Sequence, residues 1–252
     1  MTTVLAITNQ KGGVGKTTTA INLGAALAAL ERRVLLVDCD PQGNATRGLG
    51  VEPEPPHLYH VLSGQVPIAE AIRETGFPNL GLVSAGRDLV GVEIEFVGLD
   101  GWQYRLRRAL AGVVAGLDMI LLDCPPSLGH LTVLALTAAE RVLVPMQCEY
   151  FALEGISALV KTLRRVRGSS NPRLALGGIL LTMHDERTNL SHEVAAEVRQ
   201  HFGDRVFETV VPRNVRLAEA PSHGQPILQY DIKSRGAEAY LALAREILAR
   251  AA

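Results

Sequence analysis

The feature that most constrains this chain of 252 residues is a glycine-rich segment, NQKGGVGKTT, at positions 9–18. It follows Val4–Thr8, an apolar run whose length suits a buried strand. It also opens Thr17–Leu30, an Ala- and Leu-rich segment with apolar residues at helical spacing. A helix N-terminus offers unpaired N–H groups and the positive end of the helix dipole, and both favour an anion. The segment therefore predicts a phosphate-binding loop between a strand and a helix.

The residue types in this loop suit a nucleotide and a metal ion. Gly12, Gly13 and Gly15 have no Cβ, so the backbone can curl with its N–H groups facing inward. Lys16 suits the β- and γ-phosphates, and the hydroxyl of Thr17 suits Mg²⁺. The alternative is a glycine-rich turn that only caps a helix.

The loop departs from the common pattern GxxxxGK[ST] in one respect. The first glycine of that pattern would fall at Gln10, and a second lysine, Lys11, follows it. Lysine is scarce in this chain, because only four occur and two of them lie in this loop. That concentration favours phosphate binding over a simple capping turn.

The rest of the chain alternates strand-length apolar runs with helical patterns. We expect further strands at Arg33–Asp38, Met119–Asp123, Val142–Pro145, Gly178–Met183 and Phe207–Val211. We expect further helices at Trp102–Ala115, Leu131–Ala139, Leu153–Val166, Leu190–Phe202 and Gly236–Ala251. The strands are apolar throughout, so both of their faces should be buried. This order predicts an α/β fold in one domain over 1–252, with an open, mostly parallel twisted sheet flanked by helices. Val51–Pro67 is the least regular stretch, and we expect it to be a surface excursion.

Three carboxylates follow the expected strands. Asp38 and Asp40 lie at the end of the second strand, and Asp123 ends the MILLD run. The carboxyl ends of strands are where ligands bind in open α/β sheets, so Asp123 is a candidate Mg²⁺ ligand, directly or through a water. The alternatives are a helix cap or surface carboxylate at Asp123 and an ordinary cap at Asp40.

Four motifs together resemble those of a known family. Lys11–Thr18 (KGGVGKTT) resembles the deviant Walker A motif of the ParA/MinD group of ATPases. Val34–Thr46 is similar to the second motif of that group, and Leu121–Ser127 to its Walker B motif. Val210–Gly224 is similar to the C-terminal stretch of the small chromosome-partition ParA proteins, often called Soj. The resemblance covers nearly the whole chain.

This resemblance implies an ATPase that uses ATP and Mg²⁺, with Lys11, Lys16 and Asp40 in catalytic roles. It implies ATP contacts in the loop and near the base, at Lys11, Gly12, Gly13, Val14, Gly15, Lys16, Thr17, Thr18, Met183, Pro212 and Asn214. It implies metal-binding roles for Thr17, Asp38 and Asp123, with Asp38 supporting the Mg²⁺ shell.

Asp40 would position the attacking water. Lys11 would reach the partner's ATP across a dimer, or, as the alternative, serve its own nucleotide or only the surface.

The charge of the chain bears on its partners. There are 25 basic and 26 acidic residues, a net charge of −1, which excludes DNA binding by bulk charge alone. Lys161–Arg216 nevertheless holds ten basic and six acidic residues. The resemblance implies non-specific binding of double-stranded DNA through Arg187 and Arg216, and the alternative is an ordinary solvated surface. It further implies a homodimer in the ATP state, a ParB-type DNA-binding partner, and a cytoplasmic, nucleoid-associated protein. The phosphate loop begins at residue 9, so we expect no N-terminal helix-turn-helix module.

Three alternative functions remain. A MinD-like membrane ATPase would end in a basic amphipathic helix, whereas LALAREILARAA has no aromatic residue and no lysine, so we expect packing against the domain and no membrane partner. An iron–sulfur relative would need bridging or paired cysteines, and we expect Cys39, Cys124 and Cys148 to be buried instead. A nucleotide-gated scaffold with vestigial hydrolysis is the third.

His57 and His60 lack a third metal ligand nearby, and we expect them at the surface.

Overall fold

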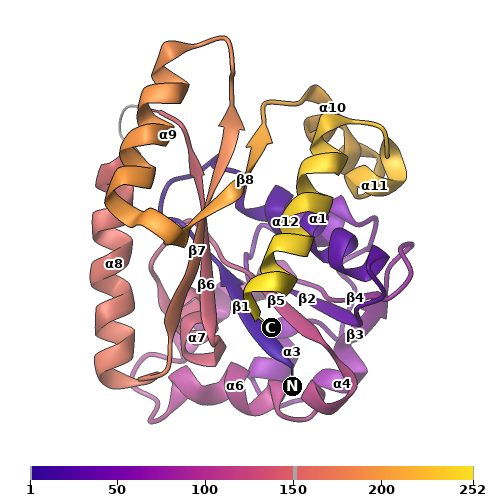
Figure 1. Ribbon diagram of the computed structural model, residues 1–252. Helices are drawn as coiled ribbons and strands as arrows, with labels where there is room; N and C mark the ends of the chain where they lie inside the picture. Colours follow the sequence, from indigo (N-terminus) through magenta and orange to yellow (C-terminus); the bar gives the residue numbers. More distant parts are fainter. Residues whose placement is uncertain (1, 150–151, 252) are drawn as a thin grey trace.

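The computed structural model describes residues 2–149 and 152–251. Within these residues eight strands form a single sheet in the order β3-β4-β2-β5-β1-β6-β7-β8 (Figure 1). Their bounds are β1 Thr3–Ile7, β2 Val34–Asp38, β3 Ile72–Glu74, β4 Leu80–Val83, β5 Met119–Asp123, β6 Arg141–Gln147, β7 Ala175–His184 and β8 Val206–Pro212. All neighbours pair in parallel except β3, which runs antiparallel to β4 at the edge. The predicted open, mostly parallel α/β sheet is confirmed.

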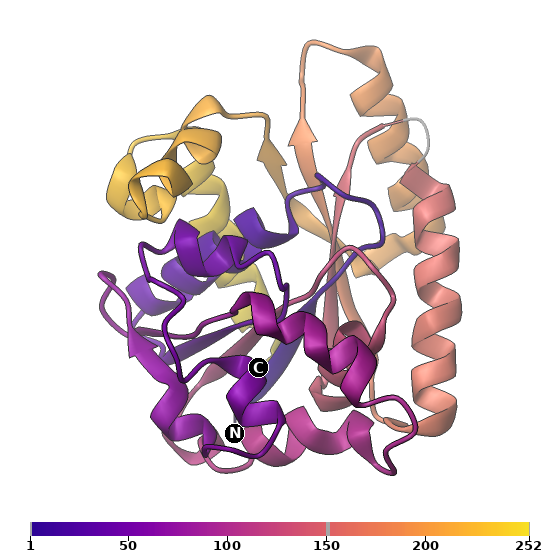
Figure 2. The same cartoon turned by 180° about the vertical axis from the view of Figure 1, so that it is seen from behind.

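Helices cover both faces of this sheet (Figures 1 and 2). One face is covered by α1 Lys16–Ala29, α2 Asn44–Gly48, α10 Val215–Glu219, α11 Ile227–Tyr230 and α12 Arg235–Ala251. The other is covered by α3 Leu58–Leu62, α4 Ile68–Ala71, α5 Val92–Glu95, α6 Arg105–Leu110, α7 His130–Ala138, α8 Ala152–Ser169 and α9 Asn189–Phe202. Short 3₁₀ helices are η1 Arg87–Gly91, η2 Trp102–Tyr104, η3 Val114–Gly116, η4 Gly203–Arg205 and η5 Ala220–His223.

Each central strand contributes side chains to two hydrophobic cores. On β1, Val4 and Ala6 belong to the core under α7 and α8, whereas Leu5 and Ile7 belong to the core under α1 and α12. Side chains alternate between the two faces of a strand, so a strand buried on both faces must be apolar at every position. This explains why the strands read as continuous apolar runs.

The register of the central strands determines where the polar residues meet. Ile7 pairs with Asp123 across β1 and β5, and Asp38 pairs with Asp123 across β2 and β5. The loop after Ile7 is the glycine-rich segment. Parallel pairing therefore places this loop and both aspartates at the carboxyl edge of three adjacent strands.

Several sequence expectations were wrong in detail. The helix expected at Trp102–Ala115 is divided into η2, α6 and η3. The excursion expected at Val51–Pro67 contains α3, whose Leu58 and Leu62 are buried. His57 was expected at the surface but is buried, and its ring packs where a Cβ on Gly86 would lie.

The packing beside β8 gives a stability prediction. A Cβ added at Gly178 would lie 2.4 Å from Cε2 of Phe207, a buried ring held under the Arg250 guanidinium at 4.4 Å. We expect Gly178→Ala to lower the free energy of unfolding by about 1–3 kcal/mol, because overpacking displaces a constrained ring. The control is Gly168→Ala on α8, where nothing lies within 4 Å and a gain of roughly 0.5–1 kcal/mol is expected. Urea denaturation measures both, and equal stabilities for the two variants would contradict the prediction.

Candidate nucleotide site

The glycine-rich loop connects β1 to α1 and has the backbone of an anion cradle. Gly13 and Gly15 have φ of 74° and 86°, a left-handed conformation that side chains disfavour. Gly15 is the N-cap of α1, which begins at Lys16. The side-chain amide of Asn9 donates to the carbonyl of Pro145 at 2.8 Å and ties the loop to β6. The free N–H groups of the first turn of α1 therefore face the loop interior.

Lys16 lies under this loop and is almost fully buried. Its Nζ donates to the carbonyl of Lys11 at 2.9 Å, so the ammonium points across the loop. Burial lowers the pKa of Lys16, while Asp123, the Cys124 thiol and Asp40 raise it. A buried ammonium beside the N-terminus of a helix suits a phosphate ligand.

Asp38 and Asp40 organise the loop after β2. Asp38 is buried and accepts from the N–H and hydroxyl of Thr46, at 2.9 and 2.7 Å, and from the N–H of Asp40 at 3.1 Å. Burial raises the pKa of Asp38 to about 6, and the Thr46 hydrogen bonds oppose this rise. Asp40 accepts from the N–H of Gln42 at 2.9 Å. One oxygen of Asp38 thus holds the backbone of Asp40, and the other holds Thr46.

Asp123 contrasts with Asp38. Both of its carboxylate oxygens are buried, and neither has a hydrogen-bond partner among the described residues. Burial and the Asp38 carboxylate raise the pKa of Asp123 well above its usual range, while the nearby Thr17 hydroxyl and Lys16 ammonium lower it. An unpartnered buried carboxylate is costly, and a divalent cation would compensate it. Asp123 and Thr17 therefore fit an Mg²⁺ ion.

The second lysine of the loop has a partner that the sequence did not indicate. Nζ of Lys11 lies 2.5 Å from Oε2 of Glu149, and both side chains are partly exposed, at 38% and 45%. Glu149 follows β6, which pairs in parallel with β1 and extends beyond its carboxyl end. The sequence signal that could have identified Glu149 is a carboxylate that follows a strand at this edge of the sheet. Lys11 is accordingly at the surface edge of the site, whereas Lys16 is inside it.

A cavity of about 320 Å³ opens beside the N-terminus of α1. The three residues expected near the base, Met183, Pro212 and Asn214, all line it. The side-chain oxygen Oδ1 of Asn214 accepts from the N–H of Arg216 at 2.8 Å, which caps α10 and leaves the side-chain NH₂ for a ligand. The sequence did not single out the other lining residues, namely Thr182, Val211, Arg213, Val215, Leu217, Ala218 and Tyr240. Gly15 and Thr18 join this cavity to the phosphate loop.

Arg187 and Arg216, the two arginines expected to bind DNA, both have carboxylate partners. Arg187 donates to both oxygens of Asp185 at 2.9 and 2.7 Å, which lowers the pKa of Asp185 well below its usual range. Arg216 lies 2.9 Å from Glu219 and 3.7 Å from Asp231.

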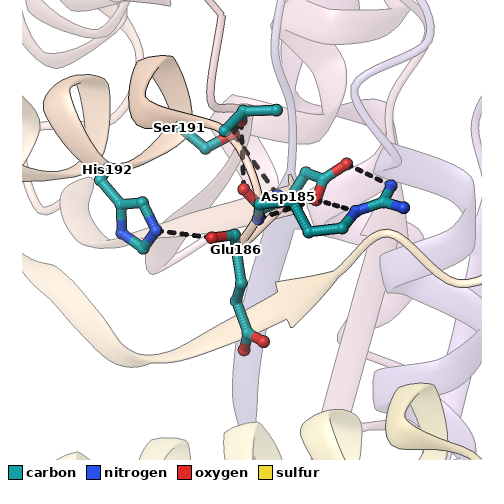
Figure 3. A network of polar contacts seen from close by, with 6 residues as sticks. Asp185, Glu186, Ser191 and His192 are labelled. Atoms are coloured by element: carbon teal, nitrogen blue, oxygen red, sulfur yellow. Dashed lines mark hydrogen bonds and ion pairs between the residues drawn. The ribbon is translucent and has the colours of Figure 1, made fainter.

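The loop that bears Arg187 is itself held in place. The N–H of Asp185 donates to the Ser191 hydroxyl at 3.4 Å, and the ring of His192 lies 3.0 Å from the Glu186 carbonyl (Figure 3). The Glu186 carboxylate pairs with Arg235 of α12 at 2.7 Å. The position of Arg187 is therefore defined by contacts within the chain.

The chain is similar to known proteins along its whole length. Residues 2–176 match the model of a family described as an AAA domain. The chromosome partitioning protein ParA of Caulobacter vibrioides is 56% identical over 251 residues, which cover 98% of this chain and 94% of that protein. The sporulation initiation inhibitor protein Soj of Bacillus subtilis is 54% identical over 248 residues, 98% of each chain.

The fold is also similar to that of a solved structure. A Mycobacterium smegmatis protein, described as cobyrinic acid a,c-diamide synthase with bound ADP and magnesium, is 41% identical. Its TM-score is 0.87, with 98% of this chain and 94% of that chain covered. The predicted resemblance is confirmed by these sequences, and the chain belongs to the ParA/Soj family of P-loop ATPases.

Proposed function

We propose that this protein is a partition ATPase that binds Mg·ATP, dimerises, and binds double-stranded DNA without sequence preference. A ParB-type partner would stimulate hydrolysis and release it from the nucleoid, so that chromosomal or plasmid DNA is moved or anchored in the cytoplasm. The observation that carries the proposal is the meeting of a phosphate loop with the unpartnered carboxylate of Asp123. The identity of 54–56% to ParA and Soj sequences, against 41% to the mycobacterial synthase, supports partition as the process.

Phosphoryl transfer depends mainly on positioning and on charge neutralisation. Mg²⁺, when bound, would supply positive charge that offsets the negative charge of the phosphates. Thr17 and Asp123 would hold that ion, and Asp38 would support its shell by fixing the loop of Asp40. Lys16 and the loop N–H groups would bind the phosphates, and Asp40 would orient the attacking water. No strong base is required.

The proposed role of Lys11 requires an exchange of partners. In the single chain Lys11 pairs with Glu149 in a partly exposed ion pair. Such pairs contribute only about 0–1 kcal/mol, so a phosphate of higher charge density can replace the carboxylate. Lys11 would then bind the ATP of a second copy, and the two sites would be complete only in the dimer.

The base would occupy the cavity lined by Met183, Pro212 and Asn214. Met183 has a φ of 51°, an uncommon conformation for a residue with a side chain, at the place where the cavity meets the phosphate loop. The thioether of Met183 and the ring of Pro212 offer apolar contacts, and the amide of Asn214 offers a donor to a ring nitrogen. This arrangement supports adenine binding.

The rival reading as a membrane ATPase has less support. A membrane-binding terminal helix needs a free apolar face. In α12, Ala237, Tyr240, Leu243 and Ala244 are fully buried against the core. In the described part of the chain, no helix is both long enough and apolar enough to span a bilayer.

ATP turnover with duplex DNA and the ParB-type protein, each alone and both together, tests the proposal. Among the described residues no arginine forms a hydrogen bond or ion pair with the phosphate loop, and GTPases that lack an arginine finger turn over at about 10⁻⁴–10⁻³ s⁻¹. We expect slow turnover alone and a marked rise when both are present. Turnover that ignores both would contradict the partition function, and the absence of turnover would favour a nucleotide-gated scaffold.

A further inference from the structure

A carboxylate from α5 caps the N-terminus of α7. Oε2 of Glu93 accepts from the N–H of His130 at 2.9 Å and lies 2.9 Å from Nδ1 of the same residue. Oε1 of Glu93 accepts from the N–H of Leu131 at 3.2 Å. The N-cap residue of α7 is Gly129, which has no side chain to cap the helix itself. The first N–H groups of a helix need partners, and a carboxylate also matches the positive end of the helix dipole. Glu93 therefore supplies a cap that α7 lacks locally.

The fold leaves room for this contact. A Cβ added at Gly129 would lie 2.4 Å from Oε1 of Glu93, so a side chain there would displace the carboxylate. Burial raises the pKa of Glu93, but the hydrogen bonds from His130 and Leu131 outweigh burial and hold the pKa below its usual value. The ring of Trp102 packs edge-on against the His130 ring, with centroids 4.6 Å apart. Glu93 is therefore charged and held in a defined position.

The helix capped in this way follows directly from the strand of Asp123. Residues 124–129 (CPPSLG) connect β5 to α7, and two of the six are prolines, whose φ is fixed. The Thr132 hydroxyl of α7 donates to the carbonyl of Ser127 at 2.6 Å and fastens the connection to the helix. A short, stiff connection transmits a shift of the α7 N-terminus to the segment beside Asp123.

The segment that bears Glu93 is also tied to the Asp38 loop. Only three residues separate β4 from η1, which runs directly into α5. Among these three, Ala85 donates its N–H to the Thr46 hydroxyl at 3.0 Å, and that hydroxyl donates to Asp38 at 2.7 Å. Leu89 of η1 is fully buried, so the segment is anchored in the core between its two ends. Hydrogen bonds therefore link this segment to both loops that follow the buried aspartates.

We infer that Glu93 is a positioning residue for the metal site, because it fixes α7, and thereby the loop after Asp123, relative to the segment that holds Asp38. Pairing of β2 with β5 sets the backbone of the two aspartates, whereas the loops after them depend on other contacts. Mg²⁺ demands near-ideal ligand geometry, so small displacements of a ligand weaken its binding. Glu93 acts through the loop after Asp123 and not on the phosphates. The inference rests on the proposed Mg·ATP site.

Three substitutions at this contact and one control test the inference. Glu93→Ala removes the carboxylate, Gly129→Ala displaces it, and Glu93→Gln keeps one oxygen acceptor without the charge. The control is Glu95→Ala, which removes the neighbouring exposed carboxylate of α5, bonded to the Tyr59 hydroxyl at 2.9 Å. Thermal unfolding shows that each variant is folded. Trp102 is the single tryptophan of the chain and packs against His130, so its emission reports loss of the contact.

The measurement is the binding of fluorescently labelled ADP, first in EDTA and then across a Mg²⁺ titration. In Glu93→Ala and Gly129→Ala the Mg²⁺ concentration at half-effect should rise about tenfold, the lower end of the range for residues that orient metal ligands. ADP affinity in EDTA should stay unchanged, because the phosphate loop is untouched. Glu93→Gln should show a smaller rise, and Glu95→Ala should match the unaltered protein.

The outcomes separate this inference from the proposed function. An unchanged Mg²⁺ midpoint in folded Glu93→Ala and Gly129→Ala would overturn the inference and leave the metal site standing. An equal loss of ADP affinity with and without Mg²⁺ would overturn it as well, because Glu93 would then only stabilise the fold. If Mg²⁺ does not affect ADP binding to the unaltered protein, the proposed metal site fails together with the inference. Should Glu93→Ala and Gly129→Ala unfold, the midpoint of Glu93→Gln decides.

Discussion

Lys16→Ala is expected to abolish measurable ATP turnover. Lys16 is buried under the glycine-rich loop, and its ammonium points into the space that the loop N–H groups surround. Removing one charge that stabilises a transition state in a water-poor site costs about 10²–10³ in rate. Because Lys16 would also contact bound phosphates, we expect ATP affinity to fall together with turnover. Steady-state phosphate release and equilibrium ATP binding measure the two effects.

The control for this variant is Lys233→Ala, which removes an exposed lysine far along the chain from the loop. It should turn over ATP at the unaltered rate. Because Lys16 is buried, thermal unfolding must show that Lys16→Ala remains folded. A folded Lys16→Ala protein with normal turnover would show that the loop is only a helix-capping turn.

Asp40→Ala is expected to separate ATP binding from hydrolysis. Asp40 is held by its own N–H contact to Asp38 and by the N–H of Gln42, at the edge of the site. It makes no contact that holds the phosphate loop together, so ATP binding should persist. Loss of the residue that positions water should lower turnover about 10²-fold or more. Asp40→Asn keeps the shape of the side chain and should give an intermediate rate, whereas unaltered turnover in both variants would remove Asp40 from the mechanism.

The sequence predicted the local part of this structure well. The glycine-rich loop was predictable because its conformation follows from residues next to one another, with Gly13 and Gly15 where φ is positive. The six apolar strands were predictable because burial on both faces requires continuous apolar runs. The edge strand β3 (IRE) and the short β4 (LGLV) have no such signal, because a three-residue edge strand is polar and a four-residue run can equally be a loop.

The sequence pattern did not predict contacts between segments that lie far apart in the chain. His57 was expected at the surface, but the histidine is buried. Its ring packs against Gly86, which has no side chain to exclude it. The pairing of Lys11 with Glu149 joins residues 138 positions apart. Met183, Pro212 and Asn214 were placed near the base only by family resemblance, and the cavity that they line depends on the pairing of β7 with β8. The charges of Arg187 and Arg216 were visible, but their carboxylate partners were not.

ATP is expected to join two copies of this chain through Lys11, and light scattering of Asp40→Ala tests this most directly. With Mg·ATP the mass should be that of two chains, and with Mg·ADP that of one. Adding Lys11→Ala to Asp40→Ala should return the mass to one chain while ATP still binds, because the exposed lysine would contact the partner's nucleotide. Asp40→Ala that binds ATP and keeps the mass of a single chain would contradict the claim.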